Sequence, residues 1–182
     1  DDDPGAAVDA SRRALARARA QGDLLLELRA VEGIAWYESF EGSTRTAIEV
    51  FAAAVELARR EGDLDAVLHD QLSLAHAHLH GLELDAADSR LDRLARDVPA
   101  ELEESWSRLV AAVRSNTARF RGRLDDALDL ARTAVAGLAD DVSFRARDVV
   151  AVQAWFDAAI EVGALADARS ALALLEYAAD HS

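Results

Sequence analysis

The sequence contains no cysteine and no lysine, and only two prolines, Pro4 and Pro99, occur in 182 residues. Without cysteine the chain can form neither a disulfide framework nor a thiolate metal site. Aromatic residues make up only 5% of the chain, and runs of the β-branched and aromatic residues that favour strands are scarce. No stretch approaches the roughly 20 apolar residues of a membrane-spanning helix. These absences argue against disulfide-rich, β-rich and membrane-spanning proteins.

The residues that are abundant favour helices and an acidic surface. Hydrophobic residues make up 51% of the chain, mostly alanine, leucine and valine, and alanine and leucine have favourable helix propensities. The formal net charge is −14, and all 20 basic residues are arginine. Because phosphate contacts need a basic surface, this charge argues against direct nucleic-acid binding and against anionic membranes. We expect a cytoplasmic protein.

Small residues recur along the chain with a spacing of 40 or 41 residues. They are Ala7, Ala47, Ala87, Ala127 and Ala168. Four and seven residues after each one comes another small or apolar residue in nearly every case, as with Phe51 and Ala54. Spacing of i, i+4 and i+7 marks one buried face of a helix. The pattern therefore predicts five equivalent helices.

Glycines divide these helices from the segments before them. Gly42, Gly81, Gly122 and Gly163 each come shortly before a recurring small residue, and we expect them to take the left-handed conformation that ends a helix. The sequence predicts a helix over 6–20 followed by hairpins over 24–60, 64–97, 101–137 and 143–179. Their first helices are expected over 24–40, 64–80, 101–120 and 143–161, and their second helices over 43–60, 83–97, 123–137 and 164–179.

The second helices resemble the tetratricopeptide repeat (TPR) family. Gly122–Ala134, Gly42–Ala54 and Gly163–Leu175 carry its pattern, and Gly81–Leu94 carries it more loosely. The resemblance implies an all-α, right-handed solenoid of about nine helices in a single domain, with no cofactor. Repeats of about 40 residues, longer than the usual 34 or so, are similar to helical arrays in large bacterial LuxR-type transcriptional regulators. The chain starts with a second-helix pattern, so we expect it to be a fragment of a longer protein.

The same resemblance implies a partner-binding groove lined by the first helices. In this family the residues one and four or five places after the small residue of each first helix face the groove. The corresponding residues here are Trp36, Phe40, His76, Leu79, His80, Asn116, Arg119 and Phe120, with Asp157 in the fourth hairpin. Aromatic and arginine side chains are typical of binding hot spots. Core packing between hairpins remains an alternative for Trp36 and Phe40.

Five arginines and no acidic residue lie between positions 106 and 123. They are Arg108, Arg114, Arg119, Arg121 and Arg123. One interpretation is an anion site for an acidic segment of a partner, because the guanidinium group can bind a carboxylate with two hydrogen bonds. The other is a solvated helix face that pairs with acidic neighbours. Arg119 alone belongs to both the run and the expected groove.

Three histidines alternate along one segment, and a metal site there is the alternative to partner binding. His76 and His80 share a helix face, His78 points away from it, and His69 lies on the face of His76. His69 and His80 are about 16 Å apart along the helix at 1.5 Å per residue, so they cannot share one ion. Only two ligands converge, whereas a metal site needs at least three. We therefore favour exposed polar residues over a metal site.

No catalytic motif occurs, neither a phosphate-binding glycine loop nor a nucleophile elbow, and no catalytic residue is assigned. The leading hypothesis is a non-enzymatic module that binds a protein or peptide, as the sensor or scaffold part of a bacterial signalling or transcriptional regulator. A metal-binding protein or metalloenzyme using His76 and His80 is one alternative. A structural module that forms homo-oligomers through exposed solenoid ends is the other.

Overall fold

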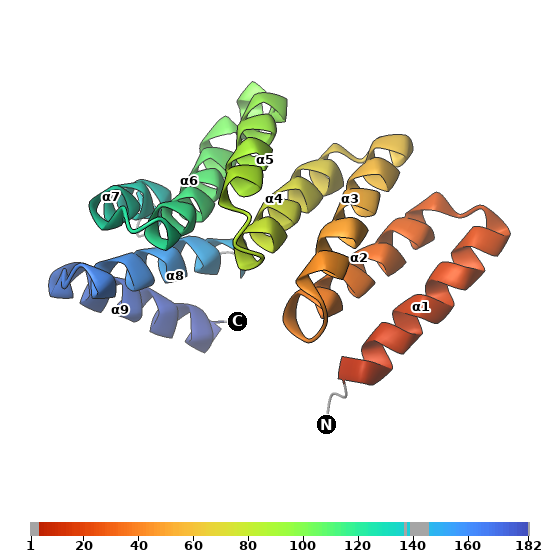
Figure 1. Ribbon diagram of the computed structural model, residues 1–182, viewed down its shortest axis with the longest axis horizontal. Helices are drawn as coiled ribbons and strands as arrows, with labels where there is room; N and C mark the ends of the chain where they lie inside the picture. Colours follow the sequence, from red (N-terminus) through yellow and green to blue (C-terminus); the bar gives the residue numbers. More distant parts are fainter. Residues whose placement is uncertain (1–3, 137, 139–145, 182) are drawn as a thin grey trace. The chain divides into compact units, whose positions relative to one another are not determined.

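The computed structural model describes residues 4–136, 138 and 146–181, and the regular secondary structure of these residues is entirely helical, which confirms the all-α class. These residues form nine α-helices, one short 3-10 helix and no strand. The helices are drawn in chain order in Figure 1. They are α1 (Pro4–Gln21), α2 (Leu24–Phe40), α3 (Thr44–Glu61), α4 (Leu64–His80), α5 (Leu84–Asp97), η1 (Ala100–Leu102), α6 (Glu103–Phe120), α7 (Leu124–Val135), α8 (Ala146–Glu161) and α9 (Leu165–His181).

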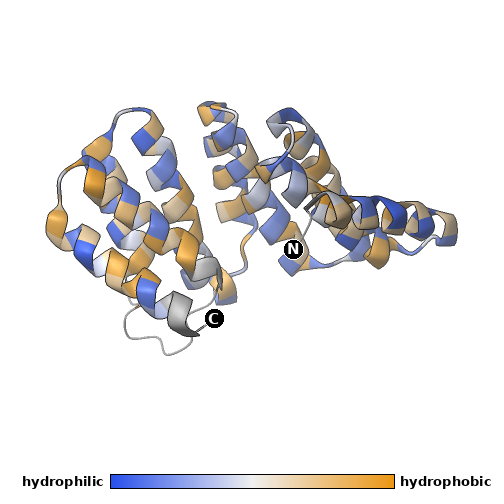
Figure 2. Cartoon of the chain, turned by 90° about the horizontal axis from the view of Figure 1, so that it is seen from below, coloured by the Kyte–Doolittle hydropathy of each residue, from blue (hydrophilic) through white to orange (hydrophobic). Residues whose placement is uncertain are grey.

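These bounds lie within a few residues of those expected from the repeat. The expected start at residue 143 and the expected end at residue 137 lie outside the described residues. Hydrophilic and hydrophobic residues alternate in bands along the helices (Figure 2), as amphipathic helices require. No helix among the described residues has the length and apolar character needed to cross a membrane.

The turns between hairpins follow from paired glycine and aspartate residues. Gly62 ends α3 in the left-handed conformation with φ of +80°, and Asp63 then accepts a hydrogen bond from the Ala66 backbone N–H at 3.0 Å. Gly22 and Asp23 repeat the arrangement before α2. Such caps satisfy backbone groups that helix ends leave free.

The expected left-handed conformation occurs at Gly122 and Gly163. The same expectation was wrong for Gly42 and Gly81, which do not have a positive φ. After Gly81 it is Leu82 that has a positive φ, of 58°, because the turn closes one residue later, where the Glu83 N–H donates to the His78 carbonyl. At Gly42 the Glu38 carboxylate accepts from the Ser43 N–H at 3.1 Å. A side chain thus closes that turn.

The chain divides into two compact units, and each is described by itself. Unit 1 comprises residues 1–90, in which α3 packs against both α2 and α4, and α1 packs against α2. Its apolar core contains one cluster of side chains from α2, α3 and α4, which includes Leu28, Val31, Leu57 and Val67. A second cluster surrounds Phe51 and Leu74. The predicted stripe of α3 is fully buried, since Ala47, Phe51 and Ala54 are at most 1% exposed.

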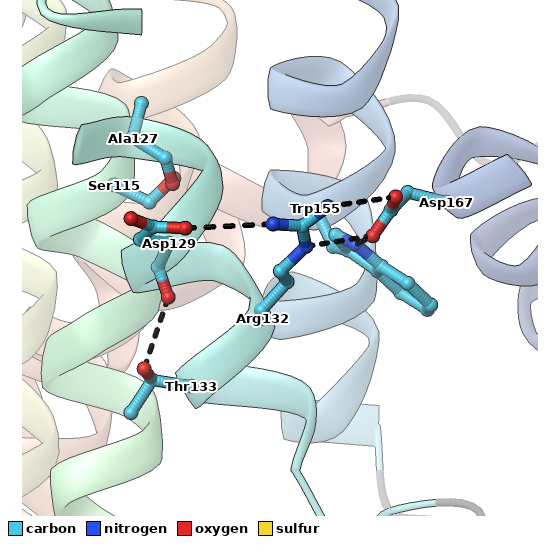
Figure 3. A network of polar contacts seen from close by, with 7 residues as sticks. All are labelled: Ser115, Ala127, Asp129, Arg132, Thr133, Trp155 and Asp167. Carbon is cyan, nitrogen blue, oxygen red and sulfur yellow. Dashed lines mark hydrogen bonds and ion pairs between the residues drawn. The ribbon is translucent and has the colours of Figure 1, made fainter. Parts of the chain in front are cut away.

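Unit 2 comprises residues 91–182, in which α6 packs against α7 and α8, and α8 packs against α7 and α9. The stripe of α7 is fully buried, and the buried Ser115 hydroxyl on α6 donates to the Ala127 carbonyl at 2.7 Å. A polar network spans three helices, because Arg132 on α7 and Trp155 on α8 both contact Asp167 on α9 (Figure 3).

The recurring stripe fails at α1 and holds only in part at α9. On α1 Val8 is buried, at 3% exposed, whereas Ala7 is exposed. On α9 the stripe residue Ala168 is buried as expected, but Leu172 is 45% exposed and Ala171 is buried in its place. In the described part of the chain α1 packs mainly against α2 and α9 mainly against α8, whereas α3 and α7 each contact two neighbours. The expectation of five equivalent faces was therefore wrong at both of these helices.

Candidate partner-binding surface

Two large aromatic side chains lie exposed at the end of α2. The rings of Trp36 and Phe40 stack with centroids 5.7 Å apart and planes inclined by 9°. Trp36 is 43% exposed and Phe40 is 72% exposed. The four-residue spacing places both side chains on one helix face, which is why they meet. These exposures do not fit core packing, the alternative that the sequence left open for this pair.

Trp36 is fixed by contacts to the two following helices. Its ring meets the edge of Phe51 on α3 at 6.0 Å between centroids, and Phe51 itself is 1% exposed. On α4 the ring of His69 lies 6.2 Å from that of Trp36. We call Trp36, Phe40, His69, His76 and His80 the aromatic–histidine surface of unit 1.

Three of the four histidines of α4 belong to this surface: His69, His76 and His80. Burial, together with electrostatic repulsion from the neighbouring His80 and His69 side chains, lowers the pKa of His76 to about 4. His76 therefore stays neutral at physiological pH, between the exposed imidazoles of His69 and His80. From the sequence, His69 is expected on the face of His76 but not in the groove. The signal for its role was its position seven residues before His76, two helical turns away.

His78 lies apart from that surface. It is 8% exposed, and its Nδ1 lies 2.8 Å from the Glu83 carboxylate. The interpretation of this histidine as an exposed polar residue was wrong, because the turn after α4 brings Glu83 back over it. Among the described residues no group of three or more histidine, cysteine, aspartate and glutamate side chains is arranged to hold a metal ion.

Leu79 does not contribute to a surface. It is 2% exposed and lies with Leu68, Leu72 and Ala75 on a buried stripe of α4 spaced by three or four residues. This spacing continues the apolar face of the helix. The assignment of Leu79 to the groove was therefore wrong, whereas its neighbour His80 is exposed.

In unit 2 the corresponding residues gather around Arg119. Its guanidinium group contacts the carboxylates of Glu161 at 2.9 Å and Asp157 at 3.4 Å, both on α8. The same guanidinium lies over the ring of Phe120, 5.3 Å from the centroid, and Phe120 is 51% exposed. Asn116 is half-buried, and its Oδ1 is buried without a hydrogen bond. Arg119 is thus largely neutralised by its own chain.

Two other arginines of the 106–123 run also lie near carboxylates. Arg114 pairs with Asp92 on α5, and Arg123 contacts Asp126 at 3.4 Å. Arg108 and Arg121 are half-buried. Pairing with acidic neighbours is what the solvated-face interpretation expects, and an incoming anion would have to displace the carboxylates at Arg114, Arg119 and Arg123. The anion site stays a prediction with no further support.

One carboxyl group in unit 1 is buried without a hydrogen bond. Asp70 on α4 is 0% exposed, and neither carboxylate oxygen has a hydrogen-bond partner. Burial and the negative charge of Glu32 raise the pKa of Asp70 to about 7, while the nearby Arg29 opposes the shift. Sequence alone does not reveal this residue, because its burial depends on how α4 packs in the unit.

Comparisons with known proteins agree with the fold. No protein-family model and no curated protein matches the sequence. The structure is similar to two crystal structures of nearly identical TPR-like repeats of a kinesin light chain-like protein from Podosopora anserina. One, a variant with a single substitution, has a TM-score of 0.54 at 14% identity and covers 94% of this chain and 92% of its own. The other has a TM-score of 0.52 at 14% identity, covering 97% and 96%. The predicted TPR-like helical array is therefore confirmed at the level of the fold.

Proposed function

We propose that this chain is a protein- or peptide-binding repeat module whose partner contacts the aromatic–histidine surface of unit 1. One observation carries the proposal: Trp36 and Phe40 stack face to face yet stay 43% and 72% exposed. TPR-like repeats generally bind proteins or peptides, which fits a site of this kind. Exposed aromatic groups lose contact with water when a partner covers them, and tryptophan is enriched among binding hot spots.

The surface is largely formed before binding. Trp36 is held by Phe51 beneath it and by His69 beside it. Because an ordered side chain loses little conformational freedom on association, such a residue contributes more of its buried area to affinity. Trp36 is thus the expected anchor of the interface, and Phe40 its exposed neighbour.

We also propose that the module is a non-enzymatic scaffold that works in the cytoplasm. TPR-like folds typically serve as scaffolds, which supports the first part. Membership of a bacterial LuxR-type regulator rests on the 40-residue period of the sequence alone. The full open reading frame tests it, because a DNA-binding or ATP-binding domain beside this segment is expected for such a regulator. An open reading frame that encodes neither would count against it.

The experiment for the binding surface is a selection of displayed peptides against the purified chain. Peptides that bind the wild type should bind a Trp36→Ala/Phe40→Ala variant at least tenfold more weakly. A Tyr177→Ala variant is the matched control, since it removes a 46% exposed aromatic ring from α9 of unit 2, outside the expected groove, and should leave affinity unchanged. Equal affinity for the wild type and the double variant, with unchanged helicity, would remove this surface as the binding site.

Homo-oligomerisation is a second candidate, favoured by the exposed apolar side of α9. Leu172 is 45% exposed, although Phe51 and Leu91, at the same place in other repeats, are at most 1% exposed. A second copy of the chain would cover this leucine. Light scattering over a concentration series should then show a dimer that Leu172→Glu dissociates, whereas a wild type that stays monomeric would contradict the candidate.

A further inference from the structure

The aromatic residues at the ends of two first helices lie in different electrostatic surroundings. Phe40 and Phe120 are 80 residues apart, which is two repeats, and both are more than half exposed. In unit 2 the guanidinium group of Arg119 lies over the Phe120 ring. In unit 1 the residue before Phe40 is Ser39, whose hydroxyl donates to the Ala35 carbonyl at 2.9 Å. Phe40 therefore has no cation from the preceding residue.

Among the described residues no arginine is found over the Trp36–Phe40 stack, and the cation–ring contact found in them is that of Arg119 with Phe120. The ring of His69 lies beside Trp36, with centroids 6.2 Å apart. Arg29, on the same helix as Trp36, is held by Glu32 at 2.9 Å and Asp63 at 3.6 Å. His76 stays uncharged at neutral pH. The electron-rich face of an indole is the best aromatic acceptor for a cation. The stack thus presents exposed ring surface, chiefly that of Phe40, over which no arginine of the described residues lies.

The charge of the whole chain favours a cationic partner. With 34 acidic and 20 basic residues, its net charge of −14 attracts basic segments over a distance of several ångströms. A negative field brings an arginine or lysine to the surface, and the aromatic faces supply the short-range contact. An acidic partner segment would meet repulsion instead.

We propose that the Trp36–Phe40 stack binds an arginine or lysine side chain of a basic partner segment. This inference rests on the proposed function and specifies the chemistry of the partner. The partner's cation takes the place at the Trp36–Phe40 stack that Arg119 holds at Phe120. An apolar partner segment is the competing occupant, and the experiment separates the two.

Two synthetic peptides serve as probes, a hexa-arginine peptide and its hexa-citrulline counterpart. Citrulline has nearly the shape of arginine but no charge. Affinities are measured by fluorescence anisotropy at about 0.15 M salt, where the screening length is about 8 Å. The variants are Trp36→Leu/Phe40→Leu, the single change Phe40→Leu, and the control Tyr177→Leu, which removes an exposed aromatic ring outside the expected groove. All keep the net charge, so general attraction of the peptide to an acidic protein is the same in each.

The hexa-arginine peptide should bind the wild type and the Tyr177→Leu variant equally. It should bind Trp36→Leu/Phe40→Leu about five- to tenfold more weakly, because loss of a cation–ring contact has an effect of that order. Phe40→Leu should give a smaller loss. This single variant keeps the test valid if the double variant does not fold, since Phe40 is mostly exposed. The hexa-citrulline peptide should bind all four proteins weakly and alike.

Two results would overturn the inference. Equal affinity of hexa-arginine for the wild type and both Trp36/Phe40 variants would show that charge alone attracts the peptide. Hexa-citrulline binding as tightly as hexa-arginine, with the same loss in the double variant, would show that the surface binds apolar groups instead. In that second case the proposed function survives, and peptides from the display selection would carry no excess of basic residues.

Discussion

Arg132 on α7 and Asp167 on α9 form an ion pair with two contacts, although 35 residues separate them in sequence. The distances from Nε to Oδ1 and from Nη2 to Oδ2 are both 3.0 Å. The indole N–H of Trp155 on α8 donates to the same Oδ1 at 3.0 Å. Figure 3 shows the three side chains converging from three helices. These hydrogen bonds lower the pKa of Asp167, chiefly through Arg132.

Asp167→Asn should destabilise the chain by about 1–2 kcal/mol at pH 7, because it removes the negative charge and one of the two oxygens that accept from Arg132. Asp129→Asn is the control, since Asp129 is 79% exposed and contacts the same arginine at only 3.5 Å. It should change stability by less than about 0.5 kcal/mol. Urea unfolding measures both. Because the pKa of Asp167 is lowered in the folded state, its stabilisation disappears as the pH falls through the folded-state value. The stabilities of the wild type and the Asp167→Asn variant should therefore converge at acidic pH.

Asp70→Asn should stabilise the chain at high pH. The folded-state pKa of about 7 lies above the usual value of 3.8, so the folded state holds a proton that the unfolded state has released between these values. Wild-type stability should therefore decline as the pH rises from about 4 to 7. The variant should lack this decline. Its stability relative to the wild type should therefore be about 2–4 kcal/mol greater at pH 8 than at pH 5. Identical pH profiles in urea unfolding would contradict the burial of the Asp70 carboxyl group.

His76→Gln should remove a pH dependence of the opposite sign. The folded-state pKa of about 4 lies below the usual 6.5, so the unfolded state binds the proton first as the pH falls. Wild-type stability due to His76 should be complete above pH 6.5 and decline toward pH 4, by about 1–3 kcal/mol. Thermal unfolding of the two proteins at pH 7 and pH 4.5 measures the effect. A wild type and variant that lose stability equally would place His76 in water.

The 40-residue period allowed the helices and their turns to be predicted, because a buried face leaves a repeated pattern of small residues. Ala47, Ala127 and their neighbours follow it, and the paired Gly62 and Asp63 mark a helix end and a helix start. The pattern failed at Ala7 and Leu172, since α1 and α9 have fewer neighbours than α3 and α7 in the described part of the chain. The period therefore predicts the buried face of a helix with neighbours on both sides, such as α3 or α7, and not that of α1 or α9.

The candidate site was predictable only where local spacing decides it. Trp36 and Phe40 lie four residues apart, so their common face follows from the sequence. The pairing of Arg119 with Glu161 does not, because the two side chains are 42 residues apart and meet through the packing of α6 and α8. For the same reason the sequence could not reveal that Asp70 is buried or that His69 contacts Trp36.

The most direct test of the binding surface uses the indole N–H signals of the three tryptophans in a nitrogen–proton NMR spectrum. Trp36 is 43% exposed, whereas Trp106 is 3% exposed and Trp155 donates to Asp167. Titration with a peptide obtained by display selection should shift the Trp36 signal first and furthest. Saturating peptide that moves the Trp155 or Trp106 signal and leaves that of Trp36 unchanged would contradict the account.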